Sequence, residues 1–114
     1  MAFVLDESAS YIWPVKAKIP TNNGKHSVQT FNVEFKRITQ SRVLEMFAQI
    51  NKGTITDMEI CFEVILGWDS VTDGDGNPLD FNQGNLKKLL DVPTVALAIG
   101  ETFFNSINGG REKN

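Results

Sequence analysis

The residues best suited to chemistry in this sequence are acidic side chains in the segment 69–80. This segment combines glycine and asparagine with four carboxylates, at Asp69, Asp73, Asp75 and Asp80. Carboxylate oxygens at regular intervals can bind calcium, but an EF-hand loop needs glycine at its sixth position and glutamate at its twelfth. A loop starting at Asp73 has Pro78 at the sixth position, and one starting at Asp69 ends on Asp80. We therefore expect a turn, which Asp-Gly and Gly-Asn-Pro favour, and no metal site.

Few other residues could support catalysis. Cys61 is the one cysteine and lies in an apolar run, where a thiol stays protonated and unreactive. His26 is the one histidine and adjoins a predicted turn. Glu59 and Glu63 are four residues apart, which fits the polar edge of a helix. With no disulfide partner or thiolate zinc motif available, we expect no catalytic residue, no metal and no cofactor, and a protein that is not an enzyme.

Composition sets further limits on the function. The chain has 114 residues, 41% of them hydrophobic, which predicts a single domain over 1–114 with flexible ends at 1–10 and 109–114. Eleven Lys and Arg against 14 Asp and Glu give a net charge of −3, which argues against nucleic-acid binding. There is no apolar stretch of about 18 residues to span a membrane. Residues 1–8 lack the pattern of a secretory signal, so we expect a cytoplasmic protein without membrane contact.

Residues 11–36 predict a β-hairpin. Apolar and polar residues alternate along both halves, which gives one buried and one exposed face. Asn23-Gly24 is the favoured pair for a tight turn, because both residues accept positive φ. Pro14 cannot donate to a neighbouring strand, so the first strand is expected at a sheet edge or to carry a bulge.

Two helices are predicted to follow the hairpin. The first covers 39–52, with Thr39 as its N-cap and an apolar side that contains Val43, Phe47 and Ile50, widened by Leu44 and Met46. The segment 57–66 has the composition of a strand but begins with a capping-box pattern. Because this pattern marks a helix start, a helix is favoured there and a strand stays open.

Two more helices are predicted near the end of the chain. Residues 67–81 are rich in turn-forming residues and indicate a connection. Asn82 then caps a short leucine-rich helix, and Pro93 suits the first turn of a last helix that ends near Asn108. The predicted fold class is α+β, with an N-terminal β-hairpin packed on a small bundle of about four helices.

The second half of the chain has a distinctive residue order. A tryptophan is followed by a turn, a capped leucine-rich helix and a last helix with an aromatic pair; the residues are Trp68, Val71, Asp73, Gly76, Pro78, Leu79, Phe81, Asn82, Leu86, Leu89, Leu90, Pro93, Val95, Ala96, Ile99, Phe103 and Phe104. This order resembles the tail assembly chaperones of long-tailed bacteriophages and prophages. In that family a tryptophan precedes a V-x-D-x-x-G-x-P/L-x-F/Y turn. The resemblance extends over about 11–108 and is most specific at 68–104.

The resemblance implies a non-enzymatic function in virion assembly. Members of the family bind the tape measure protein in the host cytoplasm, keep it soluble, promote assembly of the tail tube around it and are absent from the mature virion. In many members a programmed frameshift makes a longer form that recruits the tail tube protein. The final residues Glu112-Lys113-Asn114 can be encoded by GAA-AAA-AAY, which contains a slippery heptamer.

The sequence does not decide which residues contact a partner. It also leaves two other functions open. The hairpin edge or a groove between the last two helices could contact a partner, and copies could associate with one another into a homo-oligomer. The aromatic residues favoured for partner binding or self-association are Trp13, Phe31, Phe35 and Trp68, although the same side chains could fill the core. The alternative function is a structural minor tail protein, a terminator or tube-associated component, present in the virion. A regulator directed at a host protein has no feature in its favour.

Overall fold

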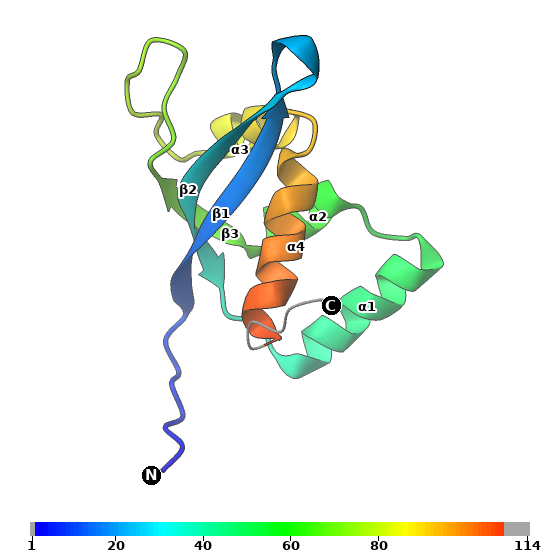
Figure 1. Cartoon of the computed structure of the whole chain (residues 1–114). Helices are drawn as coiled ribbons and strands as arrows, with labels where there is room; N and C mark the ends of the chain where they lie inside the picture. Colours follow the sequence, from blue (N-terminus) through cyan, green and yellow to red (C-terminus); the bar gives the residue numbers. More distant parts are fainter. Residues whose placement is uncertain (1, 109–114) are drawn as a thin grey trace.

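The structure is a computed structural model that describes residues 2–108 (Figure 1). The elements in chain order are β1 (Ser10–Pro20), a short 3-10 turn (Asn22–Gly24), β2 (His26–Lys36), α1 (Gln40–Lys52), α2 (Asp57–Val64), β3 (Ile65–Asp69), α3 (Gln83–Leu90) and α4 (Val95–Ile107). The predicted α+β class, with an N-terminal hairpin and four helices, is confirmed. Residues 2–9 contain no helix or strand, and the predicted tail 109–114, with Glu112–Asn114, lies outside the described residues.

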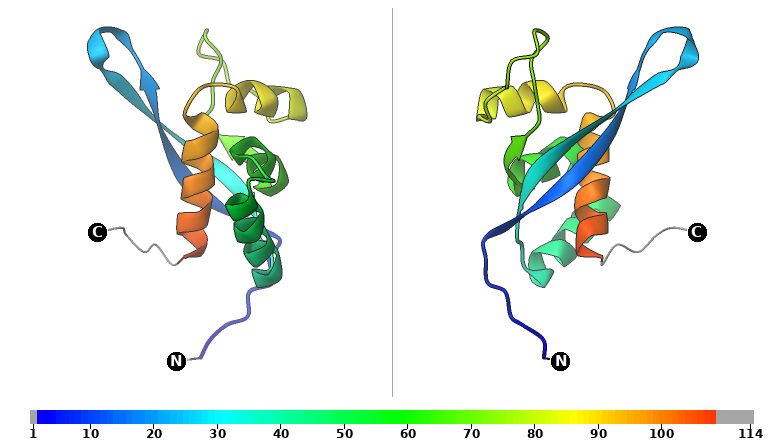
Figure 2. Two further views of the ribbon diagram at one scale, coloured as in Figure 1. Left: turned by 90° about the vertical axis from the view of Figure 1, so that its right-hand side faces the viewer. Right: turned by 60° about the vertical axis from the view of Figure 1, so that its left-hand side comes forward.

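The hairpin has the predicted alternation and turn. Val15 and Ala17 of β1 are buried, whereas Lys16 and Lys18 between and beyond them are exposed. At the turn, Asn23 has φ 64° and Gly24 has φ 72°, so both adopt the left-handed backbone that the Asn-Gly pair tolerates. The sheet is antiparallel in the order β1-β2-β3, which places β1 and its Pro14 at an edge as expected (Figure 2).

The starts of α1 and α2 follow their capping residues. Thr39 Oγ1 accepts a hydrogen bond of 3.1 Å from the backbone N–H of Arg42, and Gly53 ends α1 at φ 70°. At the start of α2, the side chains of Thr56 and Glu59 each accept a bond from the other's backbone N–H, at 3.1 and 2.9 Å. These reciprocal bonds satisfy two of the free N–H groups at the helix start.

The segment 57–66 divides between two structures, so the predicted helix over its whole length is wrong at its end. The helix stops at Val64, and Ile65 begins β3 with φ −92° and ψ 124°. β3 pairs with the free edge of β2, where Trp68 lies opposite Val33. This pairing satisfies backbone groups of β2 that the hairpin alone leaves open. The turn-rich connection therefore begins at residue 70 rather than at 67.

One hydrophobic core lies between the sheet and the helices. It joins buried residues from all the helices and strands, namely Val15, Ala17, Phe31, Val33, Phe35, Met46, Ile60, Cys61, Val64, Ile65, Leu86, Leu90, Val95, Ile99 and Phe103. Helices α2 and α4 pack against each other, and α4 also packs along β1. Helix α1 lies to the side of this assembly, as Figure 1 shows, and adds only Val43 and Met46 to the buried residues.

Candidate partner-binding surfaces

A groove opens at the turn end of the hairpin, between the sheet and α3. Its volume is about 260 Å³. We call it the distal groove, and its lining residues are Ala17, Ile19, Gln29, Thr30, Phe31, Ser70, Val71, Thr72, Leu89, Val92 and Val95. None of them carries a charge. An uncharged, mainly apolar groove of this kind suits an apolar side chain of a partner.

Local bonds fix the helical wall of the distal groove. Asn82 Oδ1 accepts a 2.8 Å bond from the backbone N–H of Asn85 and so begins α3, whose Leu86 is fully buried. The hydroxyl of Thr94 donates a 2.8 Å bond to the backbone oxygen of Lys18, which ties the start of α4 to β1. Thr94 has φ 78° and precedes the helix, so Pro93 lies before the first turn rather than in it.

The connection after β3 forms the opposite wall. Trp68 Nε1 donates a 2.8 Å hydrogen bond to the backbone oxygen of Leu79, and its ring meets that of Phe81 edge-on at a centroid distance of 5.0 Å. The backbone N–H of Leu79 in turn donates to the oxygen of Val71 at 2.9 Å. Trp68 therefore holds the connection against the sheet, with Val71 at the rim of the groove.

The four aromatic residues predicted to contact a partner lie in different surroundings. Phe35 is 0% exposed and packs among Tyr11 and Phe103, so its side chain offers no surface to a partner and the prediction for it is corrected. Phe31 is 7% exposed but lines the distal groove. Trp68 is half-buried and has the structural bonds described above. Trp13 is 38% exposed and lines a separate hollow beside the end of α4.

Helix α1 exposes an apolar ridge on the side that the sequence pattern predicted to be apolar. Leu44, Phe47 and Ile50 are all exposed, and Leu44 reaches 57%. We call these three residues the α1 ridge. Its one aromatic contact is between Phe47 and Phe104 of α4, with ring centroids 5.2 Å apart. The apolar side of α1 is wider than the area that the core covers, and this excess width was the available signal in the sequence.

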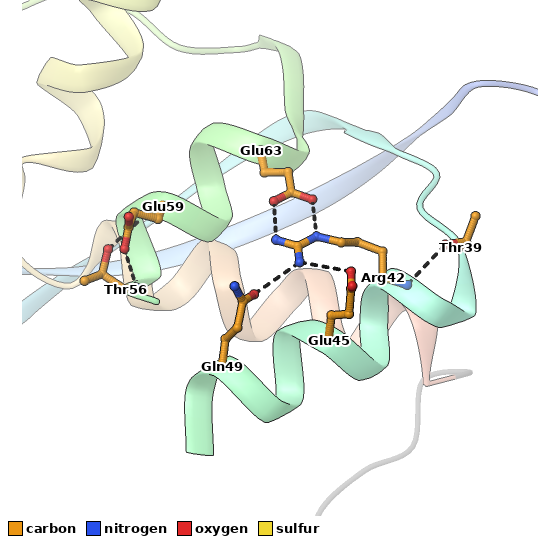
Figure 3. Close-up of polar contacts among 7 residues, drawn as sticks. All are labelled: Thr39, Arg42, Glu45, Gln49, Thr56, Glu59 and Glu63. Carbon is orange, nitrogen blue, oxygen red and sulfur yellow. Dashed lines mark hydrogen bonds and ion pairs between the residues drawn. The ribbon is translucent and has the colours of Figure 1, made fainter. Parts of the chain in front are cut away.

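An ion pair attaches α1 to α2 (Figure 3). Arg42 Nε and Nη2 donate to the two carboxylate oxygens of Glu63 at 2.7 and 2.6 Å, and Nη1 reaches Gln49 at 3.2 Å and Glu45 at 3.4 Å. The hydrogen bonds from Arg42, followed by its charge and that of Lys36, lower the pKa of Glu63 although burial acts in the opposite direction. The geometry is bidentate, which is the most specific arrangement for this pair.

We expect Glu63→Gln to lower the stability at pH 7 modestly, because the pair is partly exposed to water. The folded pKa of Glu63 lies below its ordinary value of 4.5, so the stabilisation is present above that value and is lost as pH falls through the folded pKa. Urea unfolding at pH 7 and pH 3 should therefore show a difference between wild type and variant that shrinks in acid. Glu45→Gln, which removes a longer and more exposed contact, should change little; an equal effect of both would contradict the assignment.

Cys61 and Asp73, two of the residues whose types could support chemistry, have structural roles in the core and in a turn. Cys61 is buried, and burial followed by the charge of Asp57 raises the pKa of its thiol to about 12. Asp73 accepts bonds from the backbone N–H groups of Asp75 and Asn77 at 2.9 and 3.0 Å, which closes the predicted turn. Within residues 2–108, no three His, Cys, Asp or Glu side chains gather closely enough to hold a metal ion.

Among the helices in the described part of the chain, none combines the length and apolar character needed to cross a membrane. Comparison of the chain with protein-family models, with curated proteins and with solved structures finds no match.

Proposed function

We propose that this chain is a non-enzymatic assembly chaperone that binds apolar segments of a phage tape measure protein and keeps that protein soluble. The observation that carries the proposal is the distal groove, an uncharged and mainly apolar hollow on a small acidic protein. The resemblance of residues 68–104 to tail assembly chaperones supplies the identity of the partner. Those same residues supply Val71, Leu89, Val92 and Val95 to the groove.

Helix recognition by a groove explains how such a surface would act. A long helical protein that awaits its tube exposes apolar stripes, and exposed stripes of this kind aggregate. Apolar residues at successive turns of a helix can enter a groove while its polar side stays in water. With many copies bound, the net charge of −3 on each would add up along the tape measure protein and oppose aggregation.

Co-expression with the tape measure protein of the same genome tests the proposal. We expect the wild-type chain to raise the soluble fraction of the tape measure protein and to co-purify with it. Leu89→Gln places a polar side chain in the groove and should reduce both by about tenfold, which corresponds to about 1.4 kcal/mol of binding. Leu97→Gln makes the same change on the exposed side of α4, away from the groove, and should reduce neither.

Melting curves of the free proteins separate loss of binding from loss of folding. Leu89 is half-buried, so Val92→Gln at the exposed rim replaces it if Leu89→Gln unfolds. Full binding by a folded groove variant would overturn the groove as the binding site. No effect of the wild-type chain on tape measure solubility would overturn the chaperone function. Finding the chain in purified virions would instead favour the structural minor tail protein.

A further inference from the structure

The chain begins with an exposed apolar arm. Phe3, Val4 and Leu5 are consecutive, and all three are largely exposed, from 74% for Leu5 to 91% for Phe3. Residues 2–9 leave the start of β1 and extend away from the rest of the molecule (Figures 1 and 2). Three large apolar side chains in a row have no stabilising contact in this position, because burial is what makes such residues favourable.

The base of the arm is attached to the body by Arg37. The side chain of Arg37 donates to Ser8 Oγ at 3.1 Å and forms an ion pair with Asp6 at 3.5 Å. Its backbone N–H donates to the oxygen of Ala9 at 2.9 Å, which extends the strand pairing by one step. Asp6 directly follows Leu5, so these contacts hold the arm at its base and present Phe3, Val4 and Leu5 beyond it.

The α1 ridge has the matching chemistry. Leu44, Phe47 and Ile50 are spaced by three residues and share one side of the helix, with Phe104 beside them. Neither the ridge residues nor residues 2–5 carry a charged side chain. Each chain therefore carries an apolar segment and an apolar surface, and in this structure the two are not joined.

We propose that the arm of one copy docks on the α1 ridge of a second copy. Each chain is donor and acceptor, so two copies can exchange arms reciprocally in a symmetric dimer. Two such contacts bury on the order of 1,000 Å², the size at which interfaces become specific. A different protein that docked a helix on the α1 ridge would leave the arm exposed. Exchange between two copies covers both the ridge and the arm. The contact needs no tape measure protein and uses none of the distal groove, so it stands independently of the proposed function.

Sedimentation of the chain alone tests self-association. The wild type should form dimers as its concentration rises. The double variant Phe3→Glu/Leu5→Glu should raise the dissociation constant by at least about tenfold. Ile12→Gln, at an exposed position on the outer side of β1, should leave it unchanged. A wild type that stays monomeric, or an arm variant that associates as well as the wild type, would overturn the proposal.

Disulfide cross-linking between two tagged variants identifies the contact. Phe3→Cys in one copy should link to Leu44→Cys in another at least about tenfold more than to Ile12→Cys. Native Cys61 is buried and its thiol stays protonated, so it does not compete. Equal linking to residues 44 and 12 would refute the arm–ridge contact even if the chain proved to be a dimer.

Discussion

Phe35→Ala should lower the free energy of unfolding by about 3–5 kcal/mol, the range for removing a buried aromatic ring. The side chain is 0% exposed and lies where β2, β1 and α4 meet. Its ring centroid is 5.2 Å from that of Phe103 and 5.8 Å from that of Tyr11. Truncation leaves a cavity that neither neighbouring element can close without losing its own contacts. Because domains of this kind are stable by only about 5–15 kcal/mol, much of the stability would disappear.

Urea unfolding followed by circular dichroism measures this loss. Phe3→Ala is the matched control, because it removes the same atoms from an exposed position and should change the stability of the monomer by less than about 0.5 kcal/mol. Comparable effects of the two substitutions would contradict the placement of Phe35 in the core. The result would also restore Phe35 as a candidate for partner contact.

Trp68→Ala should cost about 3 kcal/mol, the lower end of the range for removing a large aromatic side chain, because Trp68 is half-buried. The substitution removes the edge-on contact with Phe81 and the hydrogen bond to the backbone oxygen of Leu79. Both contacts hold the connection between β3 and α3. We therefore expect a lower midpoint of thermal unfolding together with faster hydrogen exchange of the Leu79 amide, which bonds to Val71.

Trp68→Phe separates the two contributions. Phenylalanine keeps an aromatic ring beside Phe81 but has no N–H donor, so the cost should fall to about 1 kcal/mol, the net value of one hydrogen bond. If Trp68→Ala abolished partner binding with unchanged melting, Trp68 would be a contact residue instead of a support for the groove. The two variants therefore decide whether Trp68 contacts a partner or supports the groove, which its residue type alone does not show.

Arm exchange and client binding would use opposite parts of the chain. The distal groove lies at the turn end of the hairpin, whereas the arm leaves from the start of β1 (Figure 1). Such a separation allows copies to associate while their grooves stay open. The two grooves of such a dimer would then bind one long tape measure protein more tightly than a single groove, since the second contact becomes intramolecular.

Local features of the fold were determined by the sequence itself. The alternation in 11–36, the Asn23-Gly24 turn and the caps at Thr39 and Thr56 act between residues close in the chain, so their physical cause is visible in one stretch of sequence. Backbone sterics allow positive φ at Asn and Gly. A threonine hydroxyl at a helix start can accept a bond from a free backbone N–H of the same helix, whatever the rest of the fold. For such features, sequence and structure agree.

Tertiary structure decided what depends on distant partners. Ile65 and Leu66 continue an apolar run that suits a helix or a strand, and only the free edge of β2 selects the strand. Likewise, Phe47 lies on the apolar side of a helix and Phe35 on the apolar side of a strand. Phe47 is nevertheless exposed, whereas Phe35 is fully buried. Burial is a property of the space between elements, and a periodic pattern specifies which side of an element is apolar without specifying what covers it. That difference is why the exposure of the groove, of the α1 ridge and of the apolar arm was decided by the tertiary structure.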